Sequence, residues 1–469
     1  MISIRSSLSE FYGEIVKAGR LCADEQAANS VDPGFAPTFE LPPLDSRLER
    51  FFSSSGVNIH DPLRYGGCTL RLLDLIGNPG TKTCKTFASH IMVARAIRHI
   101  ERTGESVLLL TPTSANKGGA LRNAVLRAIE CGLAQPHQLR VAIVVPRQGL
   151  QKLWSSALSE TPALRLRNPV FLAHDKDSSV VKQLAKACVA QHADSLLREH
   201  GVRVWHTYQV DNYRMADAVR AFIEARWIPP APPGAMRFHA QAVSSGFGVL
   251  GYAHGRRVLA QCHGHTELTA SQWLLVQQLG TPDLVLHRLF GSCNRENLPG
   301  YSIDAASGLQ VQTASPHFPA RTLALDEVID STFYSQNPVT ADLVNAAMEQ
   351  HGGTGIVVSL QECLDRYARL RSLLPTSAPT LPPDPRDLRE WALAMVMTGV
   401  LGAIDRALLP QGSEVIVHVS GCYTAQDYTP IPQEHTIAAA GVSDMLGAII
   451  DGSGACLPPP RRPENAPAR

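Results

Sequence analysis

The fold class is decided by one stretch, SVLLLTPTSANKGGALRNAVLRAIECGLAQPHQLRVAIVV (106–145). Two apolar runs of buried-strand length, 106–110 and 141–145, flank a helical segment that Gly132 ends. Continuous apolar strands separated by amphipathic helices are typical of a parallel sheet covered on both faces. The pattern continues with NPVFLAH, a long helical stretch at 179–200, and VRVWHTYQV. We therefore expect an α/β fold.

A second set of alternating apolar strands and helical segments begins near Arg237. MRFHAQAV has the pattern of a strand entering a glycine turn, and the apolar segments RRVLAQCH and DLVLHRL follow it. SEVIVHVSG is a further apolar strand, fed by the helix REWALAMVMTGVLGAIDRALL. The first 45 residues look irregular, and residues 456–469 form a Pro-rich tail with too little apolar surface to fold. A chain of this length is expected to form two packed lobes.

Composition excludes several classes of protein. The formal net charge is +1 over 469 residues, which gives no field that would hold nucleic acid or an anionic membrane. The most apolar segment, 391–404, is shorter than the roughly 20 residues that span a bilayer. The 10 cysteines are scattered without a CxxC pair, as in a reducing compartment. We expect a cytoplasmic protein that binds neither nucleic acid nor a membrane.

Lys85 lies in GNPGTKTCKTF (77–87), where a turn leads into an amphipathic helix. A positive charge near a helix N-terminus is disfavoured by the helix dipole. The same repulsion favours a neutral, nucleophilic amine, which Schiff-base chemistry requires. Taken alone, the position is more typical of a solvated surface lysine. Lys82 is a second candidate, but Thr-x-Lys places Lys85 at the helix start.

A polar turn follows the strand at 106–110. Thr113, Ser114 and Asn116 lie where this strand enters a helix. Free main-chain N–H groups at a helix start suit an anion or polar ring substituents. Ser and Asn are also routine helix caps, so capping alone would explain the turn.

A glycine turn follows the strand at 236–243. Gly246, Gly248 and Gly251 satisfy the pattern GxGxxG, which lets the main chain approach a phosphate closely. The same spacing marks dinucleotide sites, and Glu267 lies near the distance expected of a ribose-binding acid. CHGHTE does not end a clear apolar strand, which weakens the alternative of a nicotinamide-dependent oxidoreductase. The pattern alone does not distinguish one phosphate cofactor from another.

Taken together and in this order, these turns resemble those of the fold type II pyridoxal-phosphate enzymes, especially threonine synthase and cysteine synthase. NPGTKTCKTF is similar to the family's NPTGSFKDR, PTSANKGGALR to SSGNHGGALA, and VIVHVSGCYT to the closing strand VVVLTGHG. VDNYRMADAVRAFIEAR also resembles the family's NPYRLEGQKTIAYEI. The resemblance implies a tryptophan synthase β-like fold of two lobes with twisted, mostly parallel sheets. The large cofactor-binding lobe would comprise 46–105 and 205–455, and the small mobile lobe 106–204.

The resemblance also implies the residues of the site. Lys85 would carry pyridoxal 5'-phosphate as a Schiff base, with Asn116 at the ring hydroxyl and Ser420 at the pyridine nitrogen. The phosphate loop would comprise Ser245, Gly246, Phe247, Gly248 and Val249. The loop that receives the substrate carboxylate would comprise Thr113, Ser114, Ala115 and Lys117. The implied activity is β- or γ-elimination or replacement on an amino acid, by a homodimeric lyase or synthase.

Some residues depart from the family pattern. Thr86-Phe87 stand in place of Asp-Arg, Ala115 in place of a glycine, and Val249 in place of a hydroxyl or amide residue. These departures favour a specialised enzyme over a housekeeping one, and they keep a non-catalytic relative as an alternative. His263-x-His265 with Glu267 is the best metal pattern, but it lacks a third spaced cluster, so no metal is expected.

Overall fold

The computed structural model describes residues 1–29, 34–173, 178–263 and 271–454. The chain divides into two compact units. Unit 1 comprises Met1–Cys22, Phe52–Ala88 and Val210–Thr429, and unit 2 comprises Ala23–Phe51, Ser89–Gln209 and Pro430–Arg469. Each unit has its own sheet and its own buried core.

The main sheet of unit 1 has the strand order β1-β2-β4-β16-β9-β10-β14, with β3 paired to β4. The strands are β1 (Ile2–Ile4), β2 (Val57–Ile59), β3 (Leu63–Tyr65), β4 (Cys68–Asp74), β9 (Arg237–Ala242), β10 (Ser271–Gln278), β14 (Gly353–Val358) and β16 (Glu414–Val419). From β4 to β14 in this order, neighbouring strands run parallel. Helix α15 (Ala392–Asp405) packs on β9, β10, β14 and β16, and its residues 392–403 are all buried. A helix that is apolar on all sides is stable only in such an interior.

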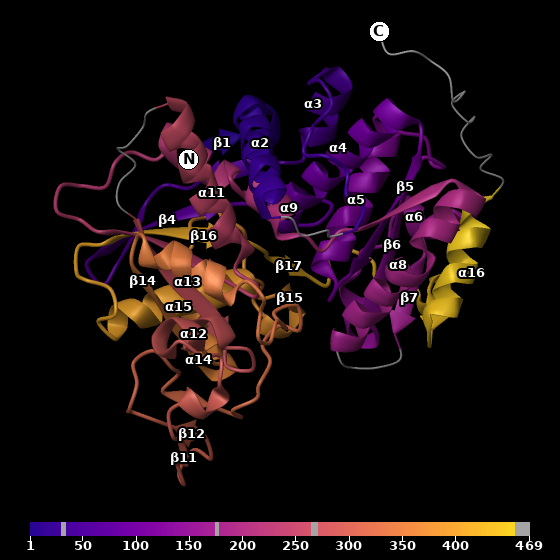
Figure 1. Ribbon diagram of the computed structural model, residues 1–469. Coiled ribbons are helices and arrows are strands. Elements are labelled where there is room, and N and C mark those ends of the chain that lie inside the picture. Colours follow the sequence, from indigo (N-terminus) through magenta and orange to yellow (C-terminus); the bar gives the residue numbers. More distant parts are fainter. Residues whose placement is uncertain (30–33, 174–177, 264–270, 455–469) are drawn as a thin grey trace. The chain divides into compact units, whose positions relative to one another are not determined.

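The sheet of unit 2 has the order β18-β7-β6-β5-β8 and is parallel throughout. Its strands are β5 (Ser106–Pro112), β6 (Leu139–Pro146), β7 (Val170–Ala173), β8 (Val202–His206) and β18 (Ile437–Ala439). Every residue of β5 and β6 is buried, as in a sheet covered on both faces. Helix α5 (Asn116–Glu130) joins β5 to β6, and α8 (Ser178–His200) packs beside α16 (Val442–Ser453) (Figure 1). The expected α/β fold is confirmed.

The expectation of an irregular N-terminal segment is wrong. Residues 1–29 form β1, α1 (Ser7–Glu10) and α2 (Tyr12–Asn29). Leu8, Phe11 and Ile15 are buried at a helical spacing. These apolar side chains are buried as the segment folds, and Phe11 packs against Phe222 and Trp227.

The boundaries of the units also differ from those of the expected lobes. The middle segment of unit 2 begins at Ser89, inside α4 (Lys85–Thr103), and its last segment begins at Pro430. That segment belongs to unit 2 because β18 pairs with β7 and α16 packs against α8. The Pro-rich tail at 456–469 lies outside the described residues.

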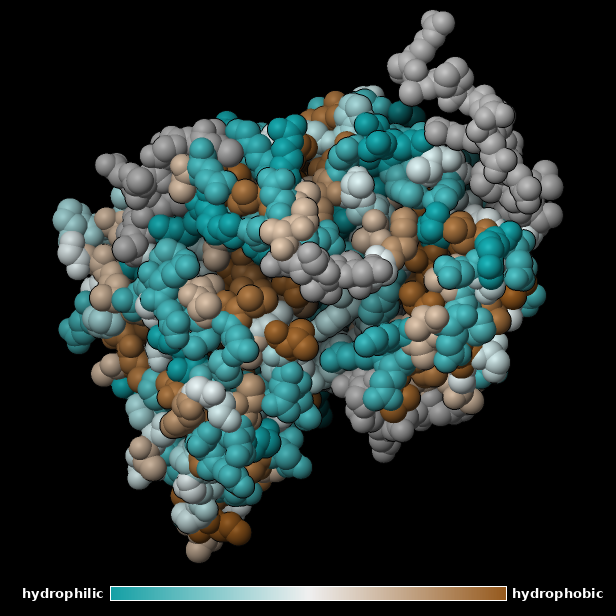
Figure 2. All heavy atoms as spheres, viewed as in Figure 1, coloured by the Kyte–Doolittle hydropathy of each residue, from teal (hydrophilic) through white to brown (hydrophobic). Residues whose placement is uncertain are grey.

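Within the described ranges, no helix is both long enough and apolar enough to cross a membrane. Figure 2 shows hydrophilic residues over most of the visible face, with hydrophobic ones interspersed. Exposed large side chains such as Ile303 and Val339 are the usual minority on a protein surface.

Candidate functional site

The loop that precedes α4 is organised by Asn78. Its Oδ1 accepts a hydrogen bond from Gly80 N–H at 2.9 Å, and its Nδ2 donates to Oγ1 of Thr86 at 3.1 Å. Oγ1 of Thr86 lies 2.8 Å from Oγ1 of Thr81. Thr86, which replaces the aspartate of the resembling motif, therefore closes this lysine loop (residues 78–86) and places Lys85 at the start of α4.

The lysine loop runs beside the end of β16. Cys84 N–H donates to the carbonyl of Ser420 at 2.9 Å, and Thr83 forms a β-bridge with Gly421. Lys85 is half-buried at this point. The structure thus brings the main chain of Lys85 next to that of Ser420, although 335 positions separate the two residues in the sequence.

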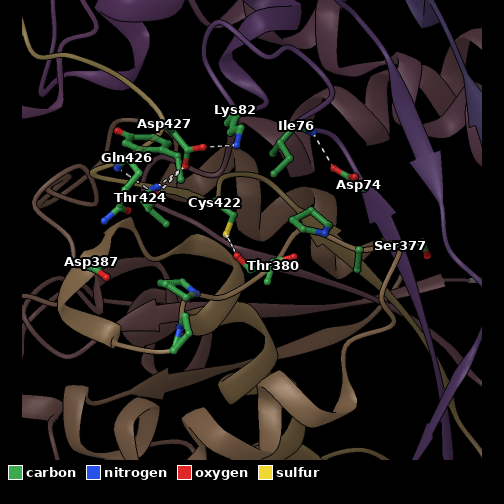
Figure 3. A pocket seen from close by; sticks show the side chains of 15 residues that line it. Asp74, Ile76, Lys82, Ser377, Thr380, Asp387, Cys422, Thr424, Gln426 and Asp427 are labelled. Carbon is green, nitrogen blue, oxygen red and sulfur yellow. Dashed lines mark hydrogen bonds and ion pairs between the residues drawn. The ribbon is translucent and has the colours of Figure 1, made fainter.

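Lys82, the second candidate lysine, lines a separate cavity. Lys82 has a φ of 46°, and its Nζ lies 2.5 Å from Oδ1 of Asp427. This ion pair lines a cavity of about 620 Å³ whose walls include Asp74, Cys422 and prolines of the 379–383 segment (Figure 3). Neither Lys85 nor the 245–249 loop lines this cavity. The two lysines therefore have distinct environments, and Lys82 already has a carboxylate partner.

Each glycine of the GxGxxG turn has its own structural reason. Gly246 has a φ of +68°, which L side chains rarely adopt. A Cβ at Gly248 would lie 2.5 Å from Oε1 of Gln241, and one at Gly251 would lie 2.2 Å from Cβ of Asp217. Gly246 therefore makes the turn, Gly248 leaves room for buried polar side chains, and Gly251 lets α11 (Phe247–His263) pack closely against α9 (Val210–Asp217).

The phosphate loop (residues 245–249) is surrounded by hydroxyl groups. Ser244 and Ser245 both place Oγ near Oγ of Ser335, at 3.0 and 2.7 Å, and Thr340 Oγ1 donates to the carbonyl of Ser245 at 2.6 Å. The first N–H groups of α11 have no partner within the helix, and the helix dipole favours an anion there. A cradle of glycines, hydroxyl groups and a helix N-terminus fits a phosphate group.

Among the described residues, no acidic side chain ends β10, where a dinucleotide site would need one. β9, α11 and β10 form a parallel βαβ unit, so a ribose-binding carboxylate would lie at the end of β10. Gln277 and Gln278 occupy that end. Oε1 of Gln277 accepts from Val285 N–H at 2.9 Å, and Gln278 is bonded to the main chain at Asp330. Glu267 lies outside the described residues.

The sequence analysis did not identify Arg220, which lies beneath the phosphate loop on α10 (Val219–Trp227). Its guanidinium carbon would be 3.0 Å from a Cβ at Gly248. Nε and Nη2 lie 2.8 and 2.7 Å from Oδ1 of Asp217. Burial alone would lower the pKa of Arg220, but Asp217 and Cys84 hold it above its ordinary value.

A chain of buried hydrogen bonds continues from Arg220. Nη1 lies 3.2 Å from Nδ1 of His418, and Nε2 of His418 lies 2.9 Å from Nδ1 of His239. Burial, followed by the charges of His239 and Arg220, lowers the pKa of His418 well below its ordinary value, so this ring is neutral. Because arginine only donates, Nδ1 of His418 is the acceptor and its proton lies on Nε2, facing His239. This series of contacts ends at Glu224, which lies 3.4 Å from Nε2 of His239.

The predicted carboxylate loop lies in unit 2. Thr113 Oγ1 accepts hydrogen bonds from the N–H groups of Ala115 and Gly118, at 3.1 and 2.9 Å, so this hydroxyl caps the start of α5. Lys117 lies with its Nζ 5.3 Å from the centre of the Tyr208 ring. The capping explanation of this turn therefore applies to Thr113, while Asn116 forms the first residue of α5.

A histidine lies close to Lys117 in the same unit. Burial, followed by the charges of Lys117 and Lys186, lowers the pKa of His206 to about 4. The imidazole at the end of β8 is therefore neutral at neutral pH.

The pattern His263-x-His265 with Glu267 lies largely outside the described residues. His265 and Glu267 are not among the described residues. In the part of the chain that the structure describes, no group of three or more His, Cys, Asp or Glu side chains could hold a metal ion.

The fold matches known structures. PLP-bound threonine synthase from Brucella melitensis superposes with a TM-score of 0.53 at 14% identity, over 94% of this chain and 89% of that one. Threonine synthase from yeast superposes with a TM-score of 0.50 at 14% identity, over 86% and 83%. The architecture is therefore that of the fold type II pyridoxal-phosphate enzymes. The chain itself belongs to a family of unknown function, DUF6002, whose model matches residues 3–453. No curated protein matches the sequence.

Proposed function

We propose that this protein is a pyridoxal-phosphate-dependent enzyme that eliminates or replaces a group at Cβ or Cγ of an amino acid. The observation that carries the proposal is the hydrogen bond from Cys84 N–H to the Ser420 carbonyl, together with the contacts of Arg220 with His418 on β16 and with the phosphate-loop region. These contacts link the predicted lysine, the predicted ring-nitrogen residue and the predicted phosphate loop within unit 1. The similar structures are threonine synthases, one of them with PLP bound.

The residues of unit 1 have complementary roles in this proposal. Lys85 would hold the cofactor through its amine, the phosphate loop would hold its phosphate, and Ser420 would lie at its ring nitrogen. Bound pyridoxal phosphate would supply an electron sink for charge that develops at the substrate Cα. Nζ of Lys85 would act as the base that removes the proton from Cα, because it stays within the site. A neutral hydroxyl at Ser420, unlike a carboxylate, would not favour a protonated ring nitrogen, which would suit elimination and replacement better than transamination.

Unit 2 supplies the substrate loop in this proposal. Asn116 bonds the ring hydroxyl of the cofactor, and Ser114, Ala115 and Lys117 bind the substrate carboxylate through main-chain and side-chain donors. Thr113 acts indirectly, because its hydroxyl holds the N–H groups of Ala115 and Gly118. A cytoplasmic homodimer, as composition and resemblance suggest, completes the proposal.

Absorbance spectroscopy of two matched lysine variants tests the proposal. We expect the wild-type protein with added pyridoxal phosphate to show the visible band of a lysine-bound cofactor, which Lys85→Ala loses and Lys82→Ala keeps. Amino acids with a leaving group at Cβ or Cγ should then shift the band. A wild-type protein that takes up no pyridoxal phosphate would refute the proposal. A band that no amino acid shifts would support the non-catalytic alternative.

A further inference from the structure

Arg220 packs against the phosphate loop and contacts His418 on β16, the strand whose end holds the lysine loop. We propose that Arg220 is a positioning residue that couples the phosphate loop to the lysine loop, so that cofactor affinity and the presentation of Lys85 depend on a single guanidinium group. This inference rests on the proposed function, since it assigns a role toward the same cofactor.

The first part of the argument is the placement of Arg220. A Cβ at Gly248 would lie 3.0 Å from its Cζ and 3.1 Å from Nη1, so the guanidinium packs directly against the main chain of the phosphate loop. The same group lies 3.2 Å from Nδ1 of His418, on β16. At the end of β16, the Ser420 carbonyl accepts a hydrogen bond from the N–H group of Cys84, the neighbour of Lys85. Arg220 is thus linked to the phosphate loop directly and to the lysine loop through β16.

The second part is the rigidity of the guanidinium. Its Nε and Nη2 are both bonded to Asp217, and its Nη1 faces the neutral ring of His418 at 3.2 Å. The side chain is 3% exposed, so it has no access to alternative partners in solvent. A planar group with a fixed set of donors holds its partners in one geometry, which a lysine ammonium group does not.

The third part is charge. A phosphate at the N-terminus of α11 would bring negative charge close to a buried cation whose own carboxylate partner, Asp217, lies on the neighbouring helix. Electrostatic attraction is strong at such a depth because water screens it little. Arg220 therefore favours the phosphate without needing a direct contact, while its contact with His418 fixes β16, whose Ser420 carbonyl holds the main chain beside Lys85.

The chain offers a matched control for the experiment. Arg237 is also a buried arginine of unit 1 with carboxylate partners, at 2.8 Å from Glu224 and 2.6 Å from Glu414. It lies at the first residue of β9, whereas the phosphate loop follows the last residue of that strand. Arg220→Met and Arg237→Met each remove a cation from buried carboxylates, so both variants should lose stability. Only Arg220→Met should change cofactor binding.

We would measure the affinity for pyridoxal phosphate by titration, and the yield of cofactor fixed to Lys85 by borohydride reduction at saturating cofactor. Arg220→Met is expected to weaken affinity by roughly 10- to 100-fold, because the phosphate loses the attraction of a buried cation, and to lower the trapped yield. Arg220→Lys keeps the charge but not the geometry, so it should recover part of the affinity and little of the yield. Arg237→Met should match the wild type in both measurements.

Each outcome is decisive. If Arg220→Met and Arg237→Met bind the cofactor equally well, or lose affinity equally, the inference is wrong while the proposed function stands. If Arg220→Met does not fold, Arg220→Lys and Asp217→Asn give the same comparison against Arg237→Lys. If the wild-type protein binds no pyridoxal phosphate, the proposed function and this inference fall together.

Discussion

At the scale of single residues, the phosphate loop depends on the absence of a side chain at one position. Gly248 lies where a Cβ would be 2.5 Å from Gln241 and 3.0 Å from Arg220, both of which are buried. We expect Gly248→Ala to displace these groups and to weaken binding of pyridoxal phosphate at least tenfold, because the loop can no longer approach the phosphate. Titration of the apoprotein with cofactor measures this loss.

Gly119→Ala is the matched control for this change. Gly119 lies inside α5, and a Cβ there would have no heavy atom within 4 Å. Alanine is the better helix former by roughly 1 kcal/mol, so this variant should be as stable as the wild type or more so, with unchanged cofactor affinity. Equal affinities for Gly248→Ala and the wild type would contradict the role given to the phosphate loop.

At the scale of elements, the lysine loop owes its shape to side-chain hydrogen bonds. Thr86→Val keeps the shape of the side chain but removes the hydroxyl that Asn78 Nδ2 and Thr81 Oγ1 contact. We expect the free energy of unfolding to fall by about 1–3 kcal/mol, because buried polar groups lose a partner. Urea denaturation measures this free energy of unfolding.

Thr83→Val is the control in the same loop. Oγ1 of Thr83 is buried and has no hydrogen-bond partner among the described residues. Replacing this hydroxyl with a methyl group should therefore cost little or stabilise the fold. If Thr83→Val destabilised the protein more than Thr86→Val, the proposed organisation of the loop would be wrong.

Most elements of the two sheets follow from local sequence. The runs at 106–110 and 141–145 are continuous and apolar, so β5 and β6 could be predicted from burial alone. The helix α2 could not be predicted with the same ease, because its apolar residues are diluted by polar ones and a long Pro-rich stretch follows. The strand β18 is only three residues long, and its pairing with β7 is a tertiary event.

The site was predictable only in part, for a related reason. Lys85, the phosphate loop and Ser420 were found through short motifs whose residues are adjacent in sequence. Arg220 escaped notice because its neighbours Gly248 and His418 are distant in the sequence, and nothing local shows which side chains surround it. The one available signal was the i, i+3 spacing of Asp217, at the end of α9, and Arg220, on α10, since buried charges require partners.

At the scale of the whole molecule, buried neutral histidines make stability depend on pH. Folding lowers the pKa of His418 well below 6.5 and that of His206 to about 4. Unfolded histidines bind protons below about pH 6.5, so the unfolded state gains protons first as the pH falls. The free energy of unfolding should therefore be greatest above about pH 6.5 and decline as the pH approaches 4.

Denaturation at pH 7 and pH 5 checks this dependence. Each histidine contributes up to about 1.4 kcal/mol per pH unit in this window. His418→Gln and His206→Gln should each lower stability at pH 7 and reduce the difference between the two pH values. An unchanged difference in both variants would show that these rings are not the groups responsible.

The most direct test of the central claim is to locate the cofactor on the chain. The wild-type protein is saturated with pyridoxal phosphate, reduced with borohydride, digested and examined by mass spectrometry. The account predicts a phosphopyridoxyl group on Lys85, in the peptide that begins α4, and none on Lys82. A label on Lys82, whose amine pairs with Asp427, or the absence of any label from a protein that has bound the cofactor, would contradict it.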